Sequence, residues 1–198
     1  MAEPSILGRP TSARQSRHRS LTELEPDLER VVFRSASGPL AVAREGSRLA
    51  LDFPSRPPRP VPSPPALAAA LGLEPLETHR SIDVLLALLP SEASVRRLAP
   101  DLSALAALEA TAVIVTGQGD EVDFVSRFFA PRKGVPEDPV TGSAHTTLIP
   151  FWSKRLGRTT LHALQVSARG GELFCEDRGE RVRIAGGAVK VMEGTFLL

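Results

Sequence analysis

Short apolar segments separated by Gly-containing turns dominate the chain from residue 30 onward. In residues 30–53, RVVFRSASGPLAVAREGSRLALDF, breaks at Ser37-Gly38 and Glu45-Gly46 leave three such segments, which predicts a three-stranded antiparallel meander. Near the C-terminus, the segments TLHALQVS, ELFCED, ERVRIAG and AVKVMEGTFLL alternate with turns at Gly170-Gly171, Gly179 and Gly186-Gly187. This spacing predicts a second run of antiparallel strands.

The middle of the chain alternates between helix and strand patterns. Residues 54–65, PSRPPRPVPSPP, favour an extended polyproline conformation, which predicts a spacer; a recognition motif for a proline-binding module is the alternative. A short helix is predicted over residues 65–72, opened by Pro65 and ended by Gly72. A buried strand is predicted in SIDVLLALLP. Two capped short helices are predicted in SEASVRRLAP and DLSALAALEA. Consecutive core strands are predicted in TAVIVTG and VDFVSRFFA.

One longer amphipathic helix is predicted in the stretch GVPEDPVTGSAHTTLIPFWSKRLG, residues 134–157. Its apolar positions recur at intervals of three and four, Gly157 ends it, and Pro150 is expected to bend it; the apolar positions are Leu148, Phe151, Trp152 and Leu156. The fold class predicted from all segments is α+β, with mainly antiparallel strands forming a curved sheet around this one helix.

The start of this helix is the candidate binding site. Backbone N–H groups at Thr141, Gly142, Ser143 and Ala144 present the positive end of the helix dipole, which suits a carboxylate or phosphate. Asp138 is close enough in sequence to accept a hydrogen bond from the same ligand. The alternative is purely structural: Ser143 or Thr141 caps the helix and Asp138 fixes a turn.

Composition and charge narrow the choice of partners. The 198 residues suffice for a sizeable core, and no apolar run approaches the roughly 18 residues that cross a bilayer, so no membrane partner is expected. The net charge of +1 comes from interleaved acids and bases, so no nucleic-acid partner is expected either. The single Cys175 forms no internal disulfide, which favours the cytoplasm.

The first residues differ from the rest. Residues 1–29 are basic, Ser-rich and poor in large apolar side chains, which predicts a disordered tail; an organellar transit peptide is a weaker alternative because the segment lacks an apolar face.

The most specific motif of the chain is EDPVTGSAH, and further motifs lie in SRFFAP, LQVSARGGEL and RVRIAGGAVKVMEGTF. With these motifs, residues 30–196 resemble the C-terminal half of the PhzF-type phenazine-biosynthesis family. The resemblance implies a diaminopimelate epimerase-like fold of two domains, each a curved sheet around a central helix, with the active site between them. It divides the chain into a tail (1–29), residual strands of the N-terminal domain (30–53), a Pro-rich linker (54–65) and the C-terminal domain (66–198).

The resemblance also implies a chemistry. The characterised reaction in the family is the isomerisation of a dihydro-hydroxyanthranilate without cofactor or metal, in which a Glu carboxylate moves a proton between carbons. The expected substrate is therefore a small cyclic or aromatic carboxylic acid. By matching positions, Asp138 would hold polar substituents of the substrate, and Gly142 and Ser143 its carboxylate, with Thr141 beside them. Family members are commonly dimers, so a homodimer is expected.

The catalytic Glu motif of the family, an Asn-Leu-Ser-Glu-Thr-like segment, does not occur in this sequence, so no catalytic residue is assigned. Three explanations are open: a misplaced start or broken reading frame that truncates the protein, an inactive remnant that binds small acids or dimerises, and an enzyme that receives its Glu from another chain. The apolar face of the 30–53 meander would then be exposed or pack elsewhere.

Other candidate residues have simpler explanations. His145 would lie in the first helical turn, as an aid to binding or as a partly exposed helix residue without a catalytic role. His79 and His162 fit structural roles in strands, and Cys175 fits a small buried apolar position. Arg127 pairs with Asp138 or Glu137, or reaches solvent. No Cys/His cluster has metal-ligand spacing, so no metal is expected.

Overall fold

The structure, a computed structural model, describes residues 29–35 and 38–189. The strands in this part of the chain are β1 (Arg30–Ser35), β2 (Gly38–Glu45), β3 (Arg48–Pro54), β4 (Arg59–Pro60), β5 (Glu77–Ser81), β6 (Val84–Leu88), β7 (Ala112–Gln118), β8 (Phe124–Phe129), β9 (Thr160–Gln165), β10 (Gly171–Asp177) and β11 (Arg181–Gly186). The helices are α2 (Pro65–Leu71), α3 (Glu92–Arg97), α4 (Leu102–Ala107), α5 (Gly142–Leu156) and the 3₁₀ turn η2 (Pro131–Lys133). The tail predicted for residues 1–29, except its last residue, lies outside the described residues.

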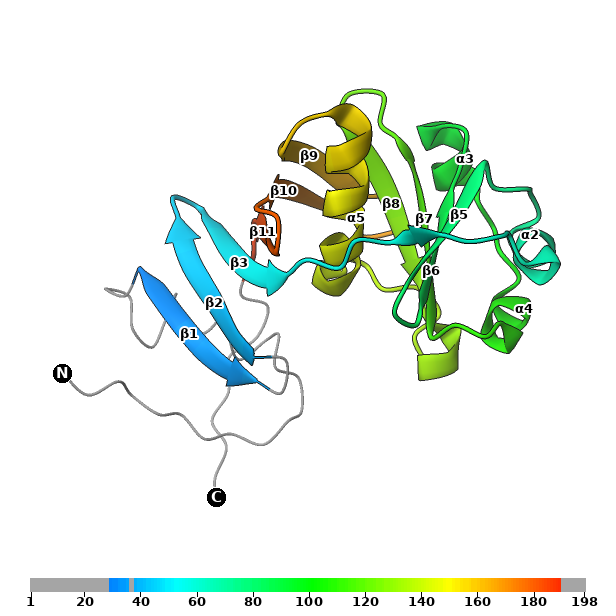
Figure 1. The fold of residues 1–198 in the computed structure, drawn as a ribbon, viewed down its shortest axis with the longest axis horizontal. Helices are drawn as coiled ribbons and strands as arrows, with labels where there is room; N and C mark the ends of the chain where they lie inside the picture. Colours follow the sequence, from blue (N-terminus) through cyan, green and yellow to red (C-terminus); the bar gives the residue numbers. More distant parts are fainter. Residues whose placement is uncertain (1–28, 36–37, 190–198) are drawn as a thin grey trace, which may run out of the picture.

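All the described strands join one sheet in the order β1-β2-β3-β11-β10-β9-β8-β7-β6-β5-β4. Neighbours are antiparallel except at β6–β7 and β8–β9, which are parallel. The sheet curves around α5, as Figure 1 shows. The predicted α+β class, a curved and mainly antiparallel sheet around one helix, is confirmed.

The central helix is held by an aromatic core. Trp152 is 2% exposed, stacks on Phe124 at 5.6 Å between ring centroids, and donates its indole N–H to the Thr116 hydroxyl at 3.0 Å. Leu148 and Ile149 are fully buried on the same helix. Because both sides of the helix meet the curved sheet, its apolar surface is wider than a single amphipathic stripe.

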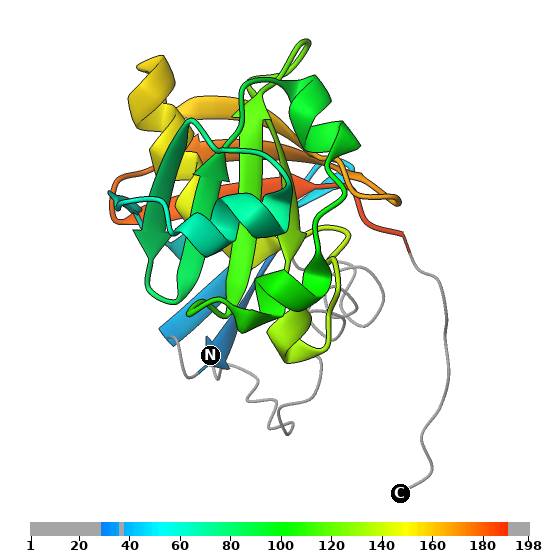
Figure 2. The same cartoon turned by 90° about the vertical axis from the view of Figure 1, so that its right-hand side faces the viewer.

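The three short helices confirm their predicted caps. Ser91 caps α3 by accepting from the Ser94 N–H, and Asp101 caps α4 by accepting from the N–H groups of Ser103 and Ala104. The helix α2 begins at Pro65 and ends at Gly72, which has a left-handed φ of 71°. Figure 2 shows α2, α3 and α4 lying over the face of the sheet that points away from α5. Their apolar side chains build a second core with β6, β7 and β8.

One strand prediction was wrong in its bounds. SIDVLLALLP was expected to be a single strand, but the chain turns at Ile82, whose φ is 50°, and β6 starts only at Val84. Ser81 instead ends β5, the strand that contains His79, whose bounds the polar sequence ETHRS did not define. The other core strands, β7 and β8, are consecutive and antiparallel as expected.

The predicted meander of residues 30–53 is present as β1, β2 and β3, and β3 continues the sheet by pairing with β11. Its apolar face is largely buried rather than exposed: Leu40, Val42 and Leu49 expose less than a tenth of their surface. The predicted final strand, residues 188–198, lies almost entirely outside the described residues.

The Pro-rich segment crosses the open side of the curved sheet, past α5, to reach β4 and α2 (Figure 1). On the way, the Arg56 N–H donates to the Thr146 carbonyl at 2.9 Å, and Ser81 Oγ donates to the Arg56 carbonyl at 3.1 Å. The helix is continuous through Pro150 over 15 residues. No helix in the described part of the chain has the length and apolarity to cross a membrane.

Candidate functional site

The segment that leads into α5 is tied to the sheet at both of its ends. After η2, Gly134 has a left-handed φ of 72°, and Ala130 bridges to Val135. The N–H of Asp138 then donates to the Phe128 carbonyl of β8 at 3.0 Å. These bonds place Asp138 beside the start of α5.

Arg127 pairs with Glu137 rather than with Asp138. Its guanidinium forms a fork on the Glu137 carboxylate, at 2.7 and 2.9 Å, and donates to the Leu98 carbonyl at 2.6 Å, where α3 ends. Of the pairings left open by the sequence, the structure shows this one. Arg127 therefore ties the approach segment to α3.

Asp138 and Thr141 are joined by a short hydrogen bond. The Thr141 hydroxyl donates to Asp138 Oδ2 at 2.5 Å, and Thr141 is 2% exposed. Thr141 occupies the N-cap position of α5, and its side chain makes no capping hydrogen bond. Its bond to Asp138 instead fixes the turn before the helix, which is the role that the structural alternative gave to Asp138.

A buried glutamine that sequence analysis missed completes this turn. Gln165, 1% exposed at the end of β9, accepts from the Thr141 N–H at 2.7 Å and donates to the Asp138 carbonyl at 2.6 Å. In the neighbouring turn, Ser167 Oγ donates to the Pro139 carbonyl at 2.9 Å. The one signal in the sequence was that Gln165 continues the inward alternation of Leu161 and Ala163 along β9.

The first residues of α5 lie toward solvent. Gly142 is half-buried and Ser143 is exposed, while the Ala144 N–H already bonds the Thr141 carbonyl at 3.2 Å. Gly142 does not have a positive φ, and a Cβ added there would meet only the Phe53 ring, at an ordinary 3.9 Å. Neither backbone conformation nor packing therefore requires glycine at this position.

His145 is fully buried, which corrects the expectation of a partly exposed helix histidine. Its Nδ1 lies 2.9 Å from the Thr141 carbonyl, and its ring lies 6.0 Å from Phe124. If Nδ1 carries the proton, His145 donates to the carbonyl of the N-cap residue and fixes the first helical turn.

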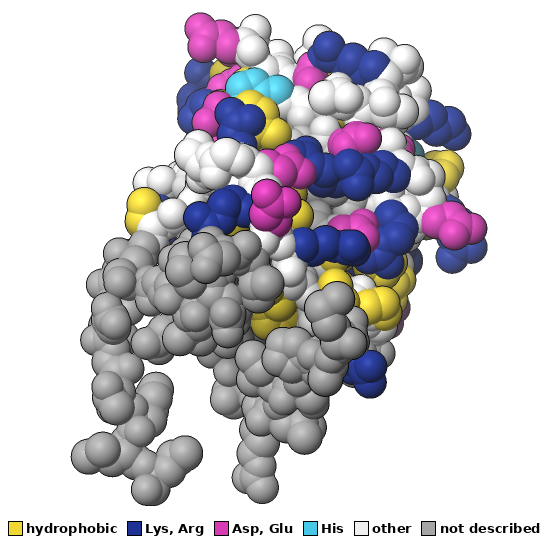
Figure 3. Space-filling model, turned by 90° about the vertical axis from the view of Figure 1, so that its left-hand side faces the viewer, with side chains coloured by type: hydrophobic (Ala, Val, Ile, Leu, Met, Phe, Trp, Pro, Cys, Tyr) yellow, Lys and Arg dark blue, Asp and Glu magenta, His cyan; other side chains and the backbone are white. Residues whose placement is uncertain are grey.

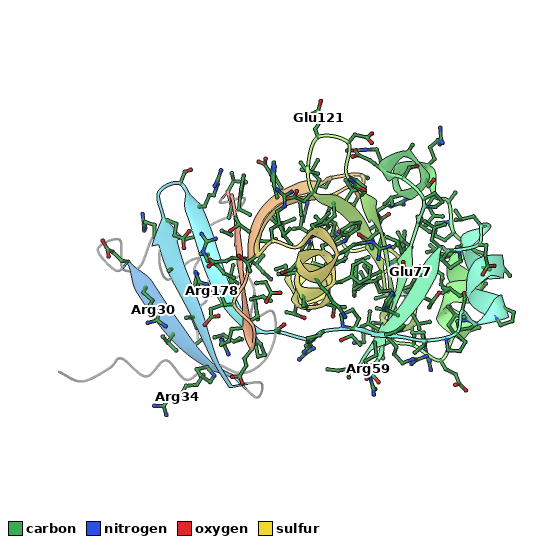
Figure 4. All side chains as sticks on the ribbon, turned by 45° about the horizontal axis from the view of Figure 1, so that its top comes forward. Arg30, Arg34, Arg59, Glu77, Glu121 and Arg178 are labelled. Carbon is green, nitrogen blue, oxygen red and sulfur yellow. The ribbon has the colours of Figure 1, made fainter. Side chains whose placement is uncertain are left out.

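The remaining predicted side chains lie away from the helix start. His79 contacts Glu77 and packs edge-on against Phe151, whereas His162 contacts Glu172 and stacks on Phe174. The fork from Arg155 and the contact with His79 lower the pKa of Glu77 to about 2. Figure 4 shows Glu77 on the opposite side of α5 from Arg30, Arg34 and Arg178.

Cys175 is a buried free thiol, as expected, and burial raises its pKa to about 12. Such a thiol packs as a small apolar group and is poorly reactive. Among the described residues, no group of three His, Cys, Asp or Glu side chains is placed to hold a metal ion.

Charge is evenly mixed on the face seen in Figure 3, which lies to the left in Figure 1 and shows acidic and basic side chains side by side. Ion pairs between β2, β3, β10, β11 and the β10–β11 turn include Arg181–Asp52, Arg183–Glu45 and Arg178–Glu176. A hollow of about 150 Å³ lies over β1, β2, β3 and β11, and another of about 370 Å³ lies between α2 and α3. Neither is lined by residues 138–143.

The fold and the helix start define a protein with one curved sheet around a helix whose first turn faces the surface. The family model described as phenazine biosynthesis-like protein matches residues 3–194, and the chain belongs to this family. The match reaches further toward the N-terminus than residue 30, where the resemblance was expected to begin.

Relatives and solved structures agree with this assignment. Two uncharacterized isomerases of Pseudomonas aeruginosa are 56% and 48% identical over 170 and 166 residues, which are 86% and 84% of this chain and 65% and 64% of those proteins. The chain thus spans just under two thirds of the length of these relatives. A crystal structure of a PhzF family protein from Enterococcus faecalis is 44% identical, covers 92% of this chain and 71% of its own, and superposes with a TM-score of 0.87.

Proposed function

We propose that residues 138–143 form the carboxylate-binding part of an isomerase site for a small cyclic or aromatic acid. Glycine at position 142 carries the proposal, because neither the fold nor the packing requires it, whereas an anion that approaches the first helical N–H groups does. Asp138, held by Thr141, would accept a hydrogen bond from a polar substituent of the same ligand. The half-buried Phe53 ring beside Gly142 offers a wall for a planar ligand.

The reaction in this proposal is a proton transfer between carbons without a cofactor. A buried carboxyl group serves this reaction as acid and base in turn. Because the sequence contains no Asn-Leu-Ser-Glu-Thr-like motif, we propose that the chain is truncated or incomplete as a catalyst, and that it binds the acid without isomerising it by itself.

Binding is tested by titrating the protein with benzoate, a planar carboxylate, and following amide NMR signals. Signals of Gly142 and Ser143 are expected to move and saturate. In Gly142→Ala, the added methyl group blocks the N–H groups, and binding should weaken about tenfold or more, since a hydrogen bond to a charged group contributes about 1.5–3 kcal/mol. Gly187→Ala is the matched control, because Gly187 also lacks a positive φ and has open space around it.

Saturating benzoate that moves only signals elsewhere would remove the basis of the binding assignment. Catalysis is tested separately with a dihydro-hydroxyanthranilate in D₂O. We expect no exchange of carbon-bound hydrogen by the chain alone; measurable exchange would show that a carboxylate of this chain performs the transfer.

The second candidate is a catalytically inactive module for binding small acids or for dimerisation. It is favoured by the missing Glu motif and, like the first candidate, expects benzoate binding without exchange by the chain alone. It differs because adding a segment or chain that carries the Glu motif would not produce exchange. We also propose a homodimer in the cytoplasm, the latter because Cys175 is a buried free thiol. Light scattering of the purified chain over a range of concentrations tests the dimer.

A further inference from the structure

The Gln165 carboxamide forms hydrogen bonds with both ends of the short turn from Asp138 to Thr141. Oε1 accepts from the Thr141 N–H at 2.7 Å, and Nε2 donates to the Asp138 carbonyl at 2.6 Å and to the Thr141 hydroxyl at 3.1 Å. With 1% of its surface exposed, Gln165 cannot itself touch a ligand that approaches from solvent. Its effect on the site has to pass through Asp138 and Thr141.

The direction of these hydrogen bonds determines how Gln165 orients the groups of the turn. Because Nε2 donates to Thr141 Oγ1, a lone pair of that hydroxyl is occupied, and the hydroxyl proton points to Asp138 Oδ2 at 2.5 Å. The carboxamide thereby orients the Asp138 carboxylate. Through Oε1 it also fixes the backbone of Thr141, one residue before the N–H of Gly142.

The hairpin between β9 and β10 contacts the middle of the same turn. Ser167 Oγ donates to the Pro139 carbonyl and accepts from the Gly170 N–H at 3.1 Å. Gly171 lies so close to Val140 that a Cβ on it would collide with the Val140 side chain. The turn therefore rests on a rigid support, and Gln165 is the part of that support that controls its polar groups.

We propose that Gln165 is a positioning residue of the acid-binding site. It sets ligand affinity by orienting the Asp138 carboxylate and the first N–H groups of α5 from the buried side of the turn. This inference rests on the proposed function, since it concerns the same site. A site whose groups are held in place before binding loses less order when the ligand arrives, so release of the support lowers affinity.

The test compares benzoate affinity in three variants by amide NMR. Gln165→Leu keeps most of the side-chain volume but removes all three hydrogen bonds, and should weaken binding roughly tenfold to a hundredfold, as loss of an outer partner does at metal sites. Thr116→Val is the matched control: it deletes a buried hydroxyl two strands away from Gln165, whose bonds to the Val125 carbonyl and Trp152 do not reach the turn, and should leave affinity within about twofold.

Gln165→Glu gives a readout that a general loss of stability does not produce. Its protonated carboxyl group can accept from the Thr141 N–H and donate to the Asp138 carbonyl, two of the three bonds of the amide, whereas the ionised form has no donor for the Asp138 carbonyl. Burial favours the protonated form, so affinity should recover as the pH falls from about 8 to about 5.5, a range in which benzoate stays ionised. The wild type measured over the same range is the baseline, because His145 contacts the Thr141 carbonyl and is itself ionisable.

The outcomes separate this inference from the proposed function. Wild-type binding together with weak binding by Gln165→Leu and pH-dependent recovery by Gln165→Glu supports the inference. Equal affinity of Gln165→Leu and wild type, equal losses in Gln165→Leu and Thr116→Val, or a flat pH profile for Gln165→Glu overturns it and leaves the proposed function intact. Absence of any benzoate shift at Gly142 and Ser143 in the wild type overturns both.

Discussion

The amide N–H of Arg56 donates to the carbonyl of Thr146, the acceptor that Pro150 leaves without an intrahelical donor. Proline has no N–H, so residue 150 cannot supply the usual bond to the carbonyl four residues earlier. The Pro-rich segment fills this position at 2.9 Å and continues to β4. The helix proline therefore creates the attachment point for the crossing segment.

Replacement of this proline should loosen the crossing segment. In Pro150→Ala, the new N–H competes with Arg56 for the Thr146 carbonyl, so the Arg56 amide should exchange with solvent faster. Native-state hydrogen exchange measures this directly, with Pro62→Ala, outside the helix, as the control. Unchanged protection at Arg56 would contradict the attachment.

Acid should weaken the contact between β5 and the end of α5. The pKa of Glu77 is lowered from 4.5 to about 2 by Arg155 and then by His79, so its contribution is complete above pH 4.5 and is lost as the pH falls toward 2. The Glu77 side chain is 39% exposed, so solvent screening limits the effect to about 1 kcal/mol.

Urea denaturation at pH 6 and pH 3 measures this effect. Glu77→Gln should reduce the stability difference between the two pH values, whereas Glu172→Gln, which removes an exposed carboxylate that also contacts a histidine, should not. The same pH dependence in Glu77→Gln and wild type would show that other carboxylates control the acid transition.

The close approach of Gly171 to Val140 should make any side chain at position 171 destabilising. A methyl group at 171 collides with the Val140 side chain, so Gly171→Ala should lower the free energy of unfolding by about 1–3 kcal/mol. Val140→Ala removes the colliding atoms, and the double variant should recover much of the loss in a double-mutant cycle. Strictly additive effects would mean that the two residues do not press on each other.

The indole N–H of Trp152 should contribute less than its ring. Trp152→Phe keeps an aromatic ring near Phe124 but removes the bond to the Thr116 hydroxyl, and should cost about 1–3 kcal/mol in thermal or chemical unfolding. Thr116→Val, made alone and in the Trp152→Phe background, tests the pair. The Thr116 hydroxyl donates to the Val125 carbonyl in both backgrounds, so the difference between the two costs reports the bond to Trp152.

Helices and strands that end in a capping residue or a turn glycine could be predicted from the sequence. Ser91, Asp101, Gly72 and Gly157 define the ends of four helices, and the glycine turns define the hairpins of the sheet. The helix start at Gly142 could be singled out as a binding candidate for the same reason, and its role stays a prediction.

Features that depend on distant partners could not be predicted. The strand β5 is polar in sequence, and its inward residues Glu77 and His79 become half-buried only because Arg155 and Phe151 on α5 lie opposite them. Likewise, a lone glutamine in a strand gives no local sign that both ends of its amide will bind a turn 24 residues earlier. The pairing of β3 with β11 has no local marker at all.

That last pairing has a consequence for how the chain folds. The ion pair between Asp52 and Arg181 joins residues 129 positions apart, and every rung between β3 and β11 closes a loop of similar size. Strands with such distant partners form slowly, because the loop entropy is lost before the contacts are gained. During synthesis β3 has to wait, with an unpaired edge, until β11 has also emerged.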